Sequence, residues 1–217
     1  MGNRAVITTL QNYNNNGIGV YLHWNGGRDS VEGFLEYMKL KKHRAPETDC
    51  YGWARLCQVI GNFFGGTTSI GIDTVNHLDT NNGDNGVYII RGWDIVSRKN
   101  FDHGIEQHRY SLNDMLKSID ECQPADEQLG DEFFAATPTP TDKLLVGDEV
   151  FIIGCSGKPE KYTVVGYGDE SPVNGSNVEG IPYVDMYTAP NGDAAWNINN
   201  YLREKSYRVV KREESLI

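Results

Sequence analysis

The sequence IGVYLHWNGGRDSVEGFLEYMKL, residues 18–40, passes from a strand pattern through a turn into a helix pattern. Residues 18–24 are rich in β-branched and aromatic side chains, which favours a strand. Gly26 and Gly27 then permit a tight turn, and Asp29 with Glu32 has the spacing of a capping box. A helix is predicted to follow and to end before Ala45-Pro46, with one apolar face made of Val31, Phe34, Leu35 and Met38.

A strand pattern also precedes this stretch, at residues 4–10, and a cluster of turn-favouring residues at 11–17 separates the two strands. After Pro46, apolar side chains again recur at helical spacing, which predicts a second helix. This helix is expected to end at Gly65-Gly66, where a C-terminal cap is possible. Its apolar face consists of Trp53, Leu56, Ile60, Phe63 and Phe64.

Two more strands are predicted at residues 69–75 and 87–98, joined by the Asp-, Asn- and Gly-rich loop 79–86. Ser111 and Asp114 form a capping-box pattern at the start of a third helix, which stops at Pro124. The order β-β-α-α-β-β-α predicts an α+β fold with an N-terminal antiparallel sheet and helices on one face.

The composition changes to acidic and proline-bearing sequence over residues 124–142, which favours an extended connector. We therefore predict an α+β domain at 1–123, a linker at 124–142 and a small β domain at 143–217. Short strands are predicted in the last part at 144–153, 161–166, 181–187 and 206–212. This spacing, with a short turn at Asn199–Leu202 before the last strand, resembles an SH3-like barrel. An unrelated small β domain is the alternative.

The 217 residues carry a formal net charge of −10, which opposes binding to generic duplex nucleic acid. The sequence has neither an apolar run of about 20 residues, the length that spans a bilayer, nor a signal-peptide pattern, so no membrane partner is expected. The four cysteines are too widely spaced for a Cys-x-x-Cys motif, which indicates reduced thiols in a cytoplasmic protein. Oligomeric state is left open.

The segment Trp24-Asn25-Gly26-Gly27-Arg28 is the first candidate ligand-binding site. A helix N-terminus offers free N–H groups, the glycines let a ligand approach the backbone, and Arg28 can bind a phosphate while Trp24 stacks on a base. The alternative is a simple strand-to-helix connector, with Trp24 in the core and the Asp29 carboxylate occupying the N–H groups.

Tyr51 and Arg55, four residues apart on the second helix, are the second candidate contact. They complete a pocket if their helix face meets the Trp24 turn, whereas the alternative is a core helix with one exposed arginine. Asp102, His103, Glu106 and His108 are potential metal ligands, but their spacing fits no regular metal site. No metal, cofactor or catalytic residue is predicted, although Cys50 or Cys57 paired with a distant histidine stays open.

Three segments resemble an uncharacterised family of Gram-positive bacteria and their phages and mobile elements: residues 1–8, 19–30 and 51–60. The resemblance covers about the first 130 residues and implies a prophage setting, not a reaction. Small accessory phage proteins often act by binding. The expectation is a non-enzymatic counter-defence protein whose partner is an anionic, nucleotide-type small molecule or a host defence protein. The alternative is an enzyme acting on a nucleotide-type substrate.

Overall fold

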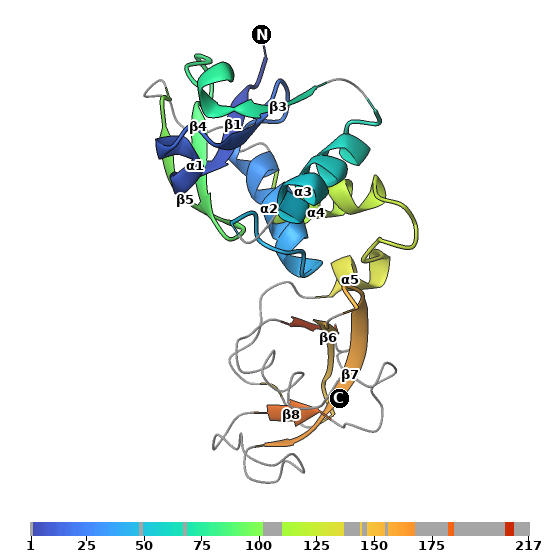
Figure 1. The fold of residues 1–217 in the computed structure, drawn as a ribbon. Coiled ribbons are helices and arrows are strands. Elements are labelled where there is room, and N and C mark those ends of the chain that lie inside the picture. The colour runs from blue at the N-terminus through green and yellow to red at the C-terminus, as the bar shows by residue number, and fades with distance from the viewer. Residues whose placement is uncertain are drawn as a thin grey trace. The chain divides into compact units, whose positions relative to one another are not determined.

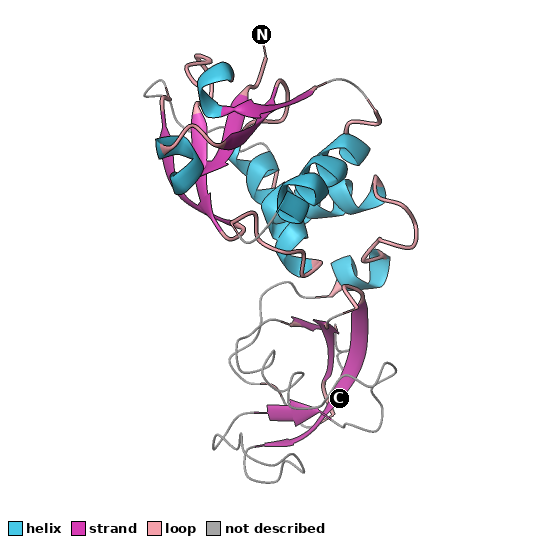
Figure 2. Cartoon of the chain, viewed as in Figure 1, coloured by secondary structure: helices cyan, strands magenta, loops and turns pink. Residues whose placement is uncertain are grey.

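A computed structural model describes residues 2–47, 50–66, 69–101, 110–136, 144, 147–154, 156–167, 182–184 and 207–210. The chain divides into two compact units, Met1–Asp126 and Glu127–Ile217. Each unit has its own sheet, and Figure 2 shows the strands in magenta and the helices in cyan. The helices of the described residues are all too short or too polar to cross a membrane.

The first unit is built on a five-stranded sheet in the order β3-β2-β1-β4-β5 (Figure 1). Its strands are β1 (Ala5–Thr9), β2 (Ile18–Leu22), β3 (Ile70–Thr74), β4 (Val87–Arg91) and β5 (Asp94–Lys99). β1 runs parallel to β4, whereas the other three pairings are antiparallel. The α+β class is confirmed, but the prediction of an antiparallel sheet is wrong at β1–β4. The chain returns through residues 79–86 to start β4 beside the start of β1.

Two local predictions in this unit are also wrong. The segment 11–17, expected to be a loop, begins with the short helix α1 (Leu10–Asn14), because the Thr9 hydroxyl oxygen accepts a hydrogen bond from the Asn12 amide at 3.2 Å. The expected single strand at 87–98 is a hairpin of β4 and β5. Gly92, with a φ of 58°, allows the tight turn between them.

The longer helices of the unit are α2 (Arg28–Leu40), α3 (Cys50–Phe63) and α4 (Leu112–Glu121), and they gather on one side of the sheet (Figure 1). The predicted apolar face of α2 is buried in full. Alternate strand residues point to the other face of the sheet, where Val6, Val87 and Ile89 pack with Tyr13 of α1 and with Leu78. The core therefore extends over both faces of the sheet.

The ends of the helices test the capping signals that were predicted from the sequence. Ser111 caps α4 as predicted, since its hydroxyl oxygen accepts the Asp114 amide at 3.1 Å. Gly65 and Gly66 follow α3 with φ values of 64° and 82°, which confirms the C-terminal glycine cap. The prediction of an Asp29–Glu32 capping box is wrong, because α2 begins at Arg28 and its N-cap is Gly27.

The second unit contains α5 (Asp131–Ala135) and a four-stranded antiparallel sheet in the order β8-β7-β6-β9. Its strands are β6 (Glu149–Ile153), β7 (Pro159–Tyr167), β8 (Pro182–Val184) and β9 (Arg208–Val209). The described residues do not close a barrel, and the predicted turn at 199–202 lies outside them.

The helix α5 lies in the segment predicted as an extended linker. The guanidinium of Arg208 stacks on the Phe133 ring at 4.1 Å, and its Nη1 donates to the Phe133 carbonyl oxygen at 3.3 Å. Phe133 is 2% exposed. Phe133 and Phe134 are both buried, so this part of the segment is packed although the segment as a whole is acidic. The division into 1–123, 124–142 and 143–217 stays a prediction.

Candidate binding site

Two segments lie at the same end of the five-stranded sheet: residues 23–28, which we call the 23–28 turn, and residues 79–86, which we call the 79–86 loop. β2 ends there while β1 and β4 begin there, because β1 is antiparallel to β2 and parallel to β4. The Asn3 amide donates to the His23 carbonyl oxygen at 3.2 Å, and the Asn85 amide donates to the Arg4 carbonyl oxygen at 3.1 Å. Both segments are therefore held by Asn3 and Arg4, the two residues directly before β1.

Gly26 has a structural role in the 23–28 turn. Its amide donates to the Asn3 carbonyl oxygen at 2.7 Å. A Cβ at this position would lie 2.6 Å from that oxygen and 2.7 Å from the Ala5 nitrogen, both backbone atoms that cannot move aside. The close approach is to the chain's own backbone, which explains the glycine at position 26 without a ligand.

A carboxylate of the chain itself lies at the N-terminus of α2. Asp29 is 6% exposed, and its Oδ1 accepts the Ser30 amide at 2.8 Å. Its Oδ2 accepts the Tyr110 amide at 3.2 Å. Although Asp29 is not the N-cap, its carboxylate meets the helix dipole and occupies donors that a phosphate would use. Gly27 contributes the cap position without a side chain.

Arg28 also has an internal partner. Its Nε donates to Oε1 of Glu32, one turn further along α2. The side chain is 26% exposed, so the guanidinium is accessible but already neutralised on one edge. This pairing lowers the attraction that Arg28 offers to an anionic ligand.

In the turn, where His23 is also exposed, Trp24 faces solvent. Its side chain is 44% exposed, which excludes the alternative that it belongs to the core. The His23 ring packs edge-on against it at 5.0 Å between centroids, and the Tyr21 hydroxyl lies 3.3 Å from Nδ1 of His23. Asn25, with a φ of 53°, continues the turn, and its side-chain amide lies 3.4 Å from the Ser30 hydroxyl oxygen. Tyr21, His23 and Trp24 form a row of three aromatic side chains, which we call the aromatic strip.

The second predicted contact lies elsewhere. Tyr51 is 64% exposed, and its ring lies 5.6 Å from the guanidinium of Arg44, beyond the C-terminal end of α2. The turn with Trp24 precedes the N-terminal end of the same 13-residue helix, which is about 20 Å away at 1.5 Å per residue. Arg55 donates to the Gln58 side chain at 2.7 Å. The structure thus does not bring Tyr51 and Arg55 to the Trp24 turn.

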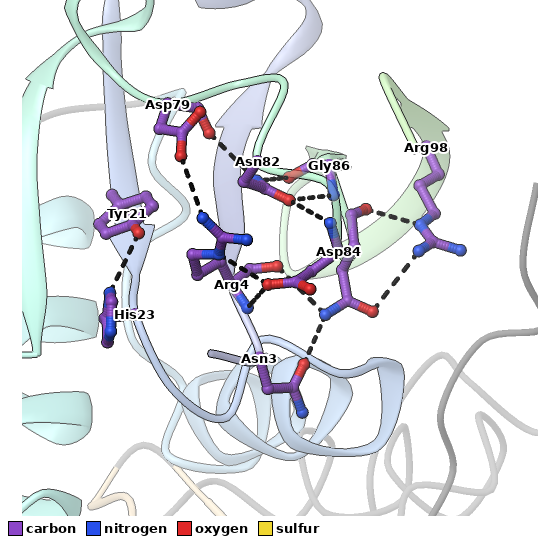
Figure 3. A network of polar contacts seen from close by, with 10 residues as sticks. Asn3, Arg4, Tyr21, His23, Asp79, Asn82, Asp84, Gly86 and Arg98 are labelled. Carbon is purple, nitrogen blue, oxygen red and sulfur yellow. Dashed lines mark hydrogen bonds and ion pairs between the residues drawn. The ribbon is translucent and has the colours of Figure 1, made fainter. Parts of the chain in front are cut away.

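The 79–86 loop is an ordered network that the sequence did not reveal (Figure 3). Asn82 is 3% exposed; its side-chain nitrogen donates to the carbonyl oxygens of Asp79 and Gly86, and its Oδ1 accepts the amides of Asp84 and Gly86. Arg4 donates from Nε to Asp84 at 2.7 Å, and this hydrogen bond raises the pKa of Arg4. The polar groups of the loop bond to one another, to Asn3 and Arg4 directly before β1, and to Arg98 of β5.

A shallow groove of about 240 Å³ lies beside Arg28. It is bounded by α2, by the β4–β5 turn with the start of β5, and by the first residue of α4. Its lining residues are Arg28, Glu32, Leu35, Glu36, Trp93, Asp94, Ile95 and Leu112. They come from three segments that are far apart in sequence, so no local pattern predicts the groove.

The structure bears on one of the two cysteines considered as nucleophiles. Burial raises the pKa of the Cys57 thiol to about 11, which keeps it protonated and unreactive at neutral pH. Cys50 is exposed at the first residue of α3. The possible metal ligands from Asp102 to His108 lie outside the described residues.

Comparison of the chain with protein-family models, with curated proteins and with solved structures found no match.

Proposed function

We propose that this chain is a non-enzymatic binding protein of a phage or mobile element that obstructs a host defence protein in the bacterial cytoplasm. The exposure of Trp24 carries the proposal. Tryptophan and tyrosine are enriched among the residues that dominate binding at protein interfaces. The turn beneath Trp24 is fixed by the Gly26–Asn3 hydrogen bond, so the aromatic strip is presented with little loss of conformational entropy on binding.

Two observations favour a protein partner over a phosphate-bearing ligand. The Asp29 carboxylate occupies amides near the N-terminus of α2, and Glu32 pairs with Arg28. The groove beside Arg28 has a volume of about 240 Å³, whereas small-molecule sites usually span about 300–1,000 Å³. A nucleotide-type ligand would still find an aromatic face at Trp24, so capture of such a ligand is the second candidate.

The test places the photoreactive amino acid p-benzoylphenylalanine at position 24 of the full chain, expressed in a Gram-positive host. The proposal expects crosslinking to one or a few host proteins in stoichiometric yield. The matched control carries the same amino acid at Tyr51, another aromatic residue of the first unit, which is 64% exposed and lies about 20 Å from the turn. Equal crosslinking from both positions, or none from position 24, contradicts a protein contact at Trp24.

A parallel assay separates the second candidate and the enzyme alternative. The purified chain is mixed with a nucleotide panel, and bound and released nucleotides are identified by mass spectrometry. Intact, stoichiometric and Trp24-dependent recovery indicates capture, whereas a changed nucleotide in excess over protein indicates turnover. The proposed obstruction of a protein expects neither result.

We further propose that the second unit has an SH3-like architecture. The antiparallel order β8-β7-β6-β9 and the buried cluster of Leu144, Val150, Ile152, Tyr162, Val164, Tyr207 and Val209 support it. Backbone chemical shifts of the full chain provide the test. A helix as the main element of residues 143–217 contradicts this proposal.

A further inference from the structure

The strand β3 forms one edge of the five-stranded sheet and pairs with β2 in an antiparallel register. The Val75 amide donates to the Gly17 carbonyl oxygen at 2.9 Å, and the Ser69 carbonyl oxygen accepts the His23 amide at 3.0 Å. In an antiparallel ladder, residues that bond to the neighbouring strand alternate with residues whose N–H and C=O groups point away from it. Because residues 69 and 75 both bond to β2, the even-numbered residues of β3 turn their backbone groups to the open edge.

Ile70 and Ile72 leave these backbone groups available to a further strand. The described part of the chain gives neither residue a hydrogen-bond partner on the open side. Thr74 differs, because its amide already donates to Oδ1 of Asp73 at 2.6 Å. Ile72 is also 53% exposed, so apolar surface accompanies the open backbone. The edge of β3 is therefore a short apolar template for pairing with another chain.

The other edge of the sheet, β5, is a poorer template. Its register with β4 shifts between Ile89 and Ile90, which leaves Val96 as the extra residue of a bulge. At the start of β5, the Asp94 carboxylate accepts a hydrogen bond from Lys39 at 2.9 Å. Bulges and charged side chains are the features by which edge strands avoid pairing. The two edges differ, and the regular one is β3.

The open edge of β3 is continuous with the aromatic strip. Tyr21, the first residue of the strip, lies directly opposite Gly71 in the register of β2 with β3. A Cβ on Gly71 would lie 3.8 Å from Cδ1 of Tyr21. Since Gly71 has no side chain, β3 places none between the Tyr21 ring and the edge at this position. A strand added to β3 could thus reach the strip from the same face of the sheet.

We infer that the partner protein supplies an extended strand that pairs with the edge of β3 and packs beside the aromatic strip. Its backbone would exchange hydrogen bonds with Ile70 and Ile72, as in other complexes formed by strand addition. An apolar side chain of the added strand would cover Ile72, and the next residue would lie over Gly71 against the Tyr21 ring. The inference rests on the proposed function for the protein partner and adds the mode of binding.

A second copy of this chain is a less suitable occupant. Antiparallel pairing of two β3 strands about Ile72 would set Thr74 of one copy opposite Ile70 of the other, although the Thr74 amide is already bonded. The two Asp73 carboxylates would lie on one face of the joined sheet, where like charges repel. The net charge of −10 on each copy adds to this repulsion.

The first test places p-benzoylphenylalanine at position 72 of the full chain, in the same Gram-positive host. It should crosslink to the protein captured from position 24, and mass spectrometry should map the crosslink to one segment of that protein. The matched control is position 96 on the bulged edge, since Val96 is 49% exposed, and its yield should be at least several-fold lower. Equal yields from positions 72 and 96, no crosslink from position 72, or a crosslink only to a second copy of the chain overturns the inference.

This test and the test at position 24 fail separately. Capture of a host protein only from position 24 overturns strand pairing and leaves the contact at Trp24. Capture only from position 72 contradicts the contact at Trp24 and supports pairing with β3.

A backbone variant distinguishes strand pairing from a side-chain contact. Ile72→Pro removes an N–H that points away from β2, so the ladder between β2 and β3 can persist, as it does for prolines on edge strands. Crosslinking from position 24 should fall about tenfold or more, because strand addition depends on main-chain hydrogen bonds. Ile72→Thr keeps the amide and a β-branched side chain, so this control should retain most of the yield.

An unchanged yield with Ile72→Pro, or equal losses in both variants, overturns the inference. Slow amide exchange at Gly71 and Asp73, measured by NMR, shows that the Pro variant keeps its ladder. If that ladder is lost, the crosslink from position 72 decides.

Discussion

The 79–86 loop and the 23–28 turn lie at the same end of one sheet, and both are rich in Asn and Gly, yet they use these residues differently. In the loop, the buried Asn82 satisfies the surrounding backbone. In the turn, Gly26 packs against β1, and the neighbouring Trp24 is left largely in solvent. Composition alone therefore does not separate a scaffold from a contact surface. The hydrogen-bond partners of each polar group distinguish the two.

The largest effect is expected for Gly86→Ala in the loop. Gly86 has a φ of 68°, and an added Cβ would collide with the carbonyl oxygens of Lys99 and Asn100. Strain and overpacking together should lower the free energy of unfolding by about 3–5 kcal/mol, measured by urea denaturation. Gly83→Ala is the control, because its φ is 69° but the nearest atom, on the Arg4 side chain, is 4.0 Å away. Equal losses in both variants would mean that the loop is not packed at Gly86.

Asn82→Ala should have the next largest effect. It removes two donated and two accepted hydrogen bonds from a buried position and leaves backbone groups without partners. The expected loss is about 2–3 kcal/mol in the free energy of unfolding. The neighbouring Asn81 is exposed, so Asn81→Ala should change stability by less than about 0.5 kcal/mol. If both asparagines prove equally dispensable, the loop is not a scaffold.

Trp24→Ala should separate binding from stability in the turn. The ring loses only its contact with His23 and a half-buried surface, which predicts a cost of about 1 kcal/mol in thermal unfolding. Binding to a protein identified by crosslinking should weaken at least tenfold, as for a hot-spot residue. A large drop in melting temperature together with unchanged affinity would assign Trp24 to the core instead.

Arg28→Ala should have the smallest effect. It removes an i,i+4 ion pair at a partly exposed position, which predicts a change of about 0.3–0.5 kcal/mol in the free energy of unfolding. Because Glu32 and Asp29 already supply the negative charges, weak binding of inorganic phosphate by the full chain should not depend on Arg28. A tenfold loss of phosphate affinity in this variant would restore the anion-site interpretation of the turn.

Local signals in the sequence predicted local structure well. The apolar face of α2, the Ser111 cap and the Gly65–Gly66 cap depend on residues within a few positions of each other, so their patterns are visible in the sequence. The parallel pairing of β1 with β4 joins residues about 80 positions apart, and no local pattern encodes it. The β4–β5 hairpin was missed because the whole stretch is rich in strand-forming residues, although Gly92 was the available turn signal.

The candidate site was predictable only in part. The sequence placed Trp24 and Arg28 at a strand-to-helix turn, but the exposure of Trp24 depends on how the turn lies on β1. The pairing of Asp29 with Tyr110 spans 81 positions and could not be read from the capping-box spacing. Tyr51 was grouped with Trp24 on the condition that its helix face meets the turn, and the length of α2 keeps the two apart.

Amide hydrogen exchange of the unmodified full chain, resolved by NMR, tests the contrast between scaffold and contact surface most directly. The amides of Asp84, Asn85 and Gly86 donate to defined acceptors within the network, at 3.1, 3.1 and 3.0 Å. We predict that they exchange at least a hundredfold more slowly than those of Trp24 and Asn25, after correction for intrinsic rates, because exchange from the loop requires the network to open. Equal exchange rates in the two segments would contradict the account.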